Sequence, residues 1–385
     1  MKNRIYLDHA ATTPVSKTVL EAMLPFFSEC AGNASAVYGT GREARKAVEK
    51  ARRQTAAAIG AEPREILFTG CGSESDNLAL KGTVFALRSR GRHIITTAIE
   101  HPAVLNTCAW LAEQGFEVTY ISPDPEGRID PDKVLRAVRE DTVLISVMAA
   151  NNEIGTIEPV AEIGAAARER GIVFHTDAVQ AVGAVPVDVN AWNADLLSLS
   201  AHKFNGPKGA GALYVRRGTR IDPLIHGGEQ ERGLRAGTEN VPGIVGLGQA
   251  IEEATLNLEE NAAKTRALRD RLTEGILTAV PGSKLNGPRE GRLPNNCSVS
   301  FSRIDGEALL LRLDLAGIAG SGGSACTSGS RETSHVLKAI GLPEELAKGS
   351  LRLTVGPENT EEEIDETVRA VREIVEDLRS MYQGS

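Results

Sequence analysis

Asp195-Leu-Leu-Ser-Leu-Ser-Ala-His-Lys203 is an apolar run of strand length that ends in side chains able to hydrogen-bond or react. Other short β-branched runs lie along the chain, and amphipathic stretches separate many of them. This alternation predicts a mostly parallel sheet covered by helices on both faces, with functional groups at the carboxyl ends of its strands. The predicted strands are residues 65–69, 93–96, 117–121, 143–148, 172–176, 195–200 and 211–215, and the predicted helices are residues 73–88, 102–113, 131–139 and 159–170.

The pattern changes after about residue 240, where a long, charged helical stretch is predicted over residues 245–278 and a final helix over residues 360–381. We therefore expect two domains with a boundary near residue 257. The large domain is predicted to span residues 15–257, and the small domain residues 1–14 and 258–385. The predicted fold is α/β, with a seven-stranded, mostly parallel sheet in the large domain and a smaller α/β C-terminal domain.

Composition excludes several classes of partner. Hydrophobic residues make up 41% of the 385 residues and charged residues 24%, as in ordinary globular proteins. A net charge of -8 without a long cluster of Lys and Arg argues against nucleic acid or an anionic membrane as the main partner. The sequence also lacks a run of eighteen apolar residues and an apolar leader over residues 1–9, so we expect a cytoplasmic location.

Cysteine and glycine patterns remove further alternatives. The five cysteines are an odd number without a CxxC pair, which argues against a disulfide framework or a zinc site, and we expect no metal. Residues 70–75 lack the third glycine of a dinucleotide fingerprint, and residues 206–209 lack the Lys-Ser/Thr end of a phosphate-binding loop. A nicotinamide or nucleoside triphosphate enzyme is therefore disfavoured.

Lys203 follows its predicted strand at the edge where a cleft is expected. Most lysines on loops are simply solvated, and the strand alone does not decide against this interpretation. An amine in this place could also form an imine with an aldehyde cofactor and later move a proton at the same carbon. The motifs elsewhere in the chain favour the second interpretation.

With the lysine segment, these motifs give the chain a specific resemblance. The sequence resembles the class V aminotransferase superfamily of fold-type I pyridoxal 5'-phosphate (PLP) enzymes, and within it the NifS/IscS-type cysteine desulfurases. The resemblance covers nearly the whole chain and implies PLP as cofactor and L-cysteine, converted to L-alanine, as substrate. The motifs are residues 6–14, 68–77, 100–101, 151–155, 175–180, 231–240, 293–296, 321–328 and 351–352, in this order.

The resemblance implies that Lys203 holds the cofactor as an imine and moves the substrate's Cα proton. It places Asp177 against the pyridine nitrogen, where an anion keeps that nitrogen protonated and the ring an effective electron sink. Without the resemblance, Asp177 could equally cap a helix. His101 is implied to stack on the ring and carry a proton. The other implied cofactor contacts are Gly72 and Ser73 at a helix N-terminus, Asn152, Gln180, Ser200, His202 and Thr238.

The resemblance also implies a homodimer in which Thr238 reaches across from the neighbouring subunit. Cys326 lies in a segment of small residues, where a thiol is accessible and an inert buried cysteine is less expected. As a thiolate, Cys326 is implied to take the substrate's sulfur as a persulfide and pass it to an iron-sulfur scaffold or a sulfur-relay protein, for iron-sulfur cluster assembly or tRNA thiolation. Arg352, and more weakly Asn33, are implied to bind the substrate's α-carboxylate.

Two alternatives stay open at this point. Another class V PLP enzyme, such as an aminotransferase on alanine or serine or a selenocysteine lyase, would share Lys203 and Asp177 without needing Cys326. A catalytically silent scaffold of the same fold would need none of them.

The chain departs from the family pattern at several positions, which leave substrate preference and loop geometry open. Cys71, in place of a common glycine, is expected to be a packing residue rather than a second redox-sensitive thiol. The other departures are the missing proline after Asn33, Tyr38 for a frequent histidine, Ser73 for the usual threonine, and Glu229 within a usual glycine run.

Overall fold

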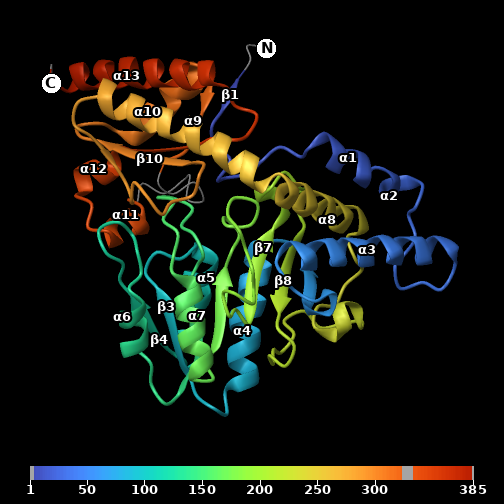
Figure 1. Ribbon diagram of the computed structural model, residues 1–385. Helices are drawn as coiled ribbons and strands as arrows, with labels where there is room; N and C mark the ends of the chain where they lie inside the picture. Colours follow the sequence, from blue (N-terminus) through green and yellow to red (C-terminus); the bar gives the residue numbers. More distant parts are fainter. Residues whose placement is uncertain (1–3, 323–332, 384–385) are drawn as a thin grey trace.

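A seven-stranded sheet forms the centre of the computed structural model, which describes residues 4–322 and 333–383 (Figure 1). The strand order is β2-β8-β7-β6-β5-β3-β4, and β8 alone among them runs antiparallel to its neighbours. The predicted fold class is therefore confirmed. The strands are β2 (Ile66–Thr69), β3 (His93–Thr97), β4 (Glu117–Ile121), β5 (Thr142–Ser146), β6 (Val173–Asp177), β7 (Leu196–Ser200) and β8 (Gly211–Val215).

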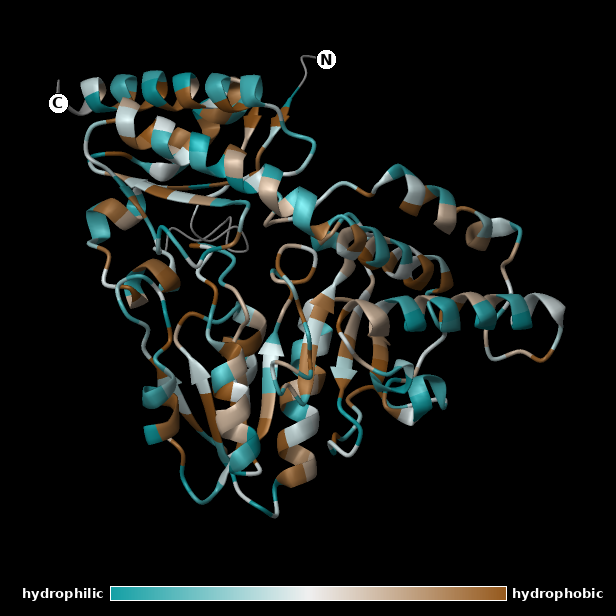
Figure 2. Cartoon of the chain, in the orientation of Figure 1, coloured by the Kyte–Doolittle hydropathy of each residue, from teal (hydrophilic) through white to brown (hydrophobic). Residues whose placement is uncertain are grey.

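Helices cover both faces of this sheet. On one face, α4 (Gly72–Leu87) and α5 (Pro102–Glu113) pack against Leu67, Leu144 and Leu196. The opposite face packs against α3 (Gly39–Ala58), α7 (Val160–Glu169) and α8 (Val241–Leu256). Every residue of β5 and β7 is buried as a result, and burial on both faces accounts for the apolar residues that make up most of each strand. Figure 2 shows hydrophobic segments along the strands at the centre of the molecule.

The parallel strands bring the ends of β2, β3, β6 and β7 to one edge of the sheet. Gly72 opens α4 just after β2, and His101 follows β3 as the N-cap of α5. Asp177 is the last residue of β6, and Lys203 ends the single turn η2 (Ala201–Lys203) after β7. This edge therefore gathers residues that are about a hundred positions apart in the sequence.

A second hydrophobic core lies above this edge in Figure 1. It contains an antiparallel sheet of β9 (Ser283–Leu285), β10 (Asn296–Phe301) and β12 (Ser350–Thr354). Helix α13 (Glu361–Gln383) packs beside α9 (Leu258–Ala279) through apolar residues spaced three or four apart. Helix α10 (Gly306–Leu315) packs there too, and β1 (Ile5–Tyr6) pairs with β11 (Ile318–Ala319), which brings the start of the chain to the second core.

We propose that these two cores mark the domains expected from the sequence, residues 15–257 and residues 1–14 with 258–385. The short helices α11 (His335–Ala339) and α12 (Glu344–Lys348) contribute apolar side chains to the first core, so they link the two units. The remaining described helices are α1 (Lys17–Met23), α2 (Pro25–Ser28) and α6 (Pro131–Arg136). Within the described residues, none of the helices has both the length and the apolar character needed to span a membrane.

Two helix predictions were wrong in their extent. The stretch predicted over residues 245–278 is two helices, because Asn257 leaves the helical conformation and its side chain bonds back to the carbonyl of Glu253. The helix predicted over residues 131–139 ends at Arg136, because the amides of Ala137 and Val138 each bond three residues back and tighten the last turn. The strand predicted over residues 143–148 likewise ends at Ser146.

Candidate active site

Lys203 lies at the sheet edge, where its amine is held by the segment that follows β1. Its Nζ donates to the carbonyl oxygens of Ala10 at 2.5 Å and Ala11 at 2.8 Å. Gln180 donates to the same Ala10 carbonyl from Nε2 at 3.0 Å. A cavity of about 420 Å³ adjoins both side chains. The amine is thus fixed in place beside an open space, as an imine-forming lysine requires.

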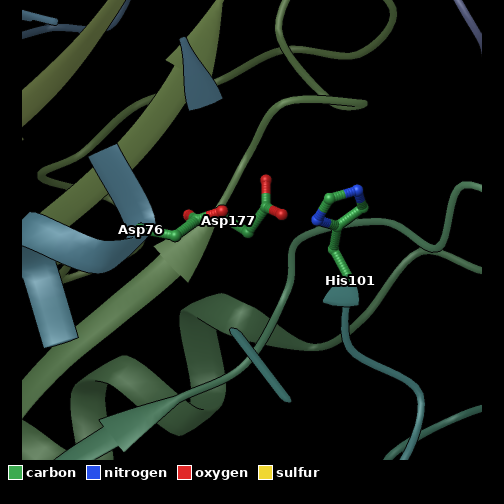
Figure 3. Close-up of side chains that lie close together, drawn as sticks. All are labelled: Asp76, His101 and Asp177. Atoms are coloured by element: carbon green, nitrogen blue, oxygen red, sulfur yellow. The ribbon is translucent and has the colours of Figure 1, made fainter. Parts of the chain in front are cut away.

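Asp177 and His101 face one another at the same edge (Figure 3). Asp177 is buried, and its Oδ1 accepts from the backbone N–H of Val179 at 2.9 Å. His101 accepts from the N–H of Ala103 at its Nδ1, 3.1 Å away, so the proton of the neutral ring lies on Nε2. The neutral ring therefore donates from Nε2.

Asp177 and His101 each affect the pKa of the other. Burial raises the pKa of Asp177, while His101, the Val179 amide and Lys203 act in the opposite direction and favour the carboxylate. Burial lowers the pKa of His101, Asp177 opposes that shift, and Lys203 adds to it. An anion supported on several sides is suited to hold a protonated ring nitrogen.

The start of α4 and the end of β7 form a cradle for an anion. A Cβ on Gly72 would lie 2.8 Å from Cγ2 of Val179, so the close approach of the chain there requires glycine. The hydroxyl of Ser200 is buried without a hydrogen-bond partner, which is rare unless a ligand supplies one. Burial and nearby lysines lower the pKa of His202 to about 4, so its ring is neutral. Ser73, beside Gly72, is exposed.

Arg352 comes to this region from β12. Its side chain is 1% exposed, donates from Nη2 to Oδ1 of Asp8 at 2.9 Å, and donates from Nη1 to the carbonyl of Asn152 at 3.0 Å. Its Nε is buried without a partner. Its backbone also pairs in both directions with that of Ser321, so Arg352 adjoins the chain shortly before Cys326. Cys326 itself lies outside the described residues.

Two predicted site residues sit on exposed loops. Asn33 accepts from the Ser35 amide and closes a local turn before α3. Thr238 is exposed on the loop that follows η3 (Gln230–Gly233). Both roles remain predictions. A side chain that donates to a second copy of the chain must be exposed, as that of Thr238 is.

The sequence analysis missed two buried carboxyl groups, Asp76 on α4 and Glu100 before His101. Asp76 lies within 4.8 Å of Asp177 and His101, measured between their polar atoms. An acidic residue near the start of a helix is usually solvated, so its position gave no signal. Glu100 is fully buried and accepts from the Thr97 hydroxyl and the Met148 amide at Oε1.

Glu100 should make the stability of the protein depend on pH. Burial raises its pKa from 4.5 to about 8. The folded state therefore holds a proton that the unfolded state has lost, and stability falls by roughly 1.4 kcal/mol per pH unit at most over that window. Glu100→Gln, which cannot ionise, is expected to lose less stability than the wild type between pH 5 and pH 8 in urea unfolding of the cofactor-free protein. Parallel pH profiles for the two proteins would contradict this assignment.

The side chains at this edge of the parallel sheet define a class of protein. They are a lysine whose amine is hydrogen-bonded, a buried aspartate, a histidine that faces the aspartate, and a helix that begins at a glycine and can hold an anion. These are the parts of a fold-type I PLP enzyme, whose cofactor brings an aldehyde, a ring nitrogen and a phosphate. The unpartnered Ser200 hydroxyl and the close approach at Gly72 fit such a group.

Comparison with known proteins gives the family. The model of the family "Aminotransferase class-V" matches residues 5–367. A protein of Methanosarcina thermophila named "Cysteine desulfurase IscS" is 57% identical over 98% of this chain and 93% of its own length. A protein of the same name from Dictyoglomus turgidum is 53% identical over 99% of this chain and 97% of its own. The chain belongs to the class-V aminotransferase family.

Solved structures agree with this membership. A structure described as "NIFS-LIKE PROTEIN" has a TM-score of 0.92 at 43% identity, covering 97% of this chain and 100% of that one. A structure described as "SspA in complex with cysteine" has a TM-score of 0.81 at 41% identity, covering 92% of this chain and 100% of that one.

Proposed function

We propose that this chain is a PLP-dependent cysteine desulfurase that converts L-cysteine to L-alanine and supplies the sulfur for iron-sulfur cluster assembly. The observation that carries the proposal is the Lys203 amine, held at the end of β7 beside Asp177 and His101. Relatives at up to 57% identity carry the name of this activity, and one similar structure has cysteine bound.

The cofactor would be held by residues of the sheet edge. Lys203 would bind its aldehyde carbon, and Asp177 its ring nitrogen. Once bound, PLP supplies an electron sink for the bonds at the substrate's Cα. His101 would cover the ring. Contacts to the phosphate and ring hydroxyl are proposed for Gly72, Ser73, Ser200, His202, Asn152, Gln180 and, from a second subunit, Thr238.

The substrate would be oriented by Arg352. A guanidinium can hold a carboxylate by two parallel hydrogen bonds, and the unpartnered Nε of Arg352 has one to offer. Asp8 and the Asn152 carbonyl already fix the plane of this side chain. Lys203 would then remove the Cα proton and return it at the end. Asn33 remains a further candidate for the same carboxylate.

Sulfur would leave the substrate by attack of Cys326. Its thiolate would form a bond to the substrate's sulfur as the Cβ–S bond breaks, and the electron pair left on carbon would take a proton to give alanine. The products are L-alanine and one persulfide on Cys326, so atoms and electrons balance. An iron-sulfur scaffold or a sulfur-relay protein would accept this sulfur. A cytoplasmic location is proposed from the sequence.

A homodimer would complete the site. Large apolar side chains are exposed on α1, α2 and the loop before α3, where a second copy could cover them. The exposed Thr238 would reach the partner's cofactor from the neighbouring loop. The exposed side chains are Leu20, Leu24, Phe27, Val37 and Tyr38.

The proposed activity predicts a product pair and a labelled residue. Purified protein incubated with PLP and L-cysteine is expected to release alanine and to gain the mass of one sulfur on the peptide that contains Cys326. Chromatography of the amino acids and peptide mass spectrometry measure both. Full alanine release by Cys326→Ser would favour another class V enzyme, such as a selenocysteine lyase. Absence of yellow colour in the pure protein would instead favour a silent scaffold.

A further inference from the structure

The face of the central sheet beneath α4 carries a patch of polar side chains inside an otherwise apolar layer. Ser146 on β5, His175 on β6 and Ser198 on β7 are fully buried there. The strand register pairs Ser146 with His175, and Ser198 with Asp177, so the patch lies directly beside the cofactor-facing carboxylate. Most buried polar side chains are hydrogen-bonded, and the contacts of His175 with both serines join these three side chains into one network.

The histidine of this network lies beside Asp76. Burial lowers the pKa of His175 to about 3, so its ring is neutral and has one N–H. Its Nδ1 lies 2.8 Å from the Ser146 hydroxyl and its Nε2 lies 3.0 Å from the Ser198 hydroxyl. Nε2 also lies 3.7 Å from Oδ1 of Asp76, and the Ser198 hydroxyl acts to lower the pKa of that carboxyl group. The ring of His175 therefore joins the two serines and places them beside Asp76.

Asp76 and Asp177 cannot both carry a full charge at little cost. Polar atoms of the two carboxyl groups lie within 4.8 Å of one another, and both side chains are buried (Figure 3). Burial, followed by the charge of Asp177, raises the pKa of Asp76 well above its ordinary value. The charge on Asp177 is favoured by His101, the Val179 amide and Lys203. Oδ1 of Asp76, by contrast, is buried without a hydrogen-bond partner, so nothing there offsets the cost of burying a negative charge. One proton therefore stays with the pair, and it resides on Asp76.

We propose that Asp76 is a positioning residue that keeps one proton beside Asp177, so that Asp177 alone presents the negative charge to the cofactor's ring nitrogen. This inference deepens the proposed function and rests on the role proposed there for Asp177. A neutral carboxyl group can stabilise and orient the neighbouring anion as a donor, whereas an ionised one would repel it. The Ser146–His175–Ser198 network lies against Asp76, with Nε2 of His175 3.7 Å from Oδ1.

Infrared spectroscopy of the full-length, cofactor-free protein tests the proton directly. The difference spectrum between wild type and Asp76→Asn at pH 7 is expected to contain the C=O stretch of a protonated carboxylic acid. A difference that contains carboxylate bands alone would overturn the proposal. This readout needs neither bound PLP nor catalysis, so it stays decisive even if the proposed function fails. A wild-type protein unable to bind PLP would count against the proposed function alone.

Cofactor affinity tests the positioning role. Asp76→Asn, which keeps a neutral donor, is expected to bind PLP with a Kd within about threefold of the wild-type value. Asp76→Ala is expected to raise the Kd about tenfold or more, as for other outer contacts of a buried site. The control is Thr83→Val on the same helix, whose hydroxyl is buried and unpartnered, and it should not change PLP affinity. Wild-type affinity in a folded Asp76→Ala, or equal losses in the Asn and Ala variants, would overturn the proposal. If Asp76→Ala does not fold, the infrared result for Asp76→Asn still decides.

Discussion

Replacing Lys203 by alanine is expected to remove the yellow colour of the holoenzyme and to lower alanine formation from L-cysteine by roughly 10⁴-fold. The reason is that one amine is proposed to serve twice: it would bind the cofactor and would move the Cα proton. Its partners include two backbone carbonyls, so the change removes hydrogen bonds at a partly buried position without emptying the core.

The matched control for this variant is Lys208→Ala, five residues further on. Lys208 is exposed on the loop before β8, so its loss should leave both colour and rate near wild type. Absorbance of the purified proteins and a timed alanine assay distinguish the two. A colourless Lys208→Ala or an active Lys203→Ala would place the cofactor elsewhere.

Arg352→Leu is expected to lower kcat/KM for L-cysteine by about 100-fold, mainly through KM, because it removes the charged group proposed to grip the α-carboxylate. Arg352→Lys should keep a positive charge but not the forked geometry of the guanidinium. It should therefore lower kcat/KM for L-cysteine by about tenfold. Steady-state kinetics with varied L-cysteine measure both effects.

Arg271→Leu is the surface control for this series. Arg271 pairs with Asp365 and Glu361 at exposed positions, where such ion pairs contribute little. It should leave KM unchanged. An unchanged KM in Arg352→Leu, with normal folding, would show that the substrate carboxylate is bound by another residue.

The sequence predicted the central sheet well because its strands are short runs rich in apolar and β-branched residues, separated by amphipathic stretches. β4 and β8 have the predicted bounds, and α5 also does, since Pro102 after His101 marks its first turn. The break at Asn257 was not predictable, because the residues on both sides of it are good helix formers and the break depends on local hydrogen bonds.

In the candidate site, Lys203 and Asp177 were singled out by the family resemblance, because a lysine after a strand or an aspartate at a strand end is ambiguous by itself. Asp76 was not, because its environment is set by His175 and Ser198, which reach it only through the pairing of two strands and the packing of α4 over them. The same holds for Asp8, which meets Arg352 from the other end of the chain.

Reduction of the holoenzyme with borohydride, followed by digestion and peptide mass spectrometry, tests the central claim most directly. The cofactor's mass should then be fixed to the peptide that contains Lys203. An adduct on any other lysine, or none at all in yellow protein, would contradict the assignment of this side chain as the residue that holds PLP.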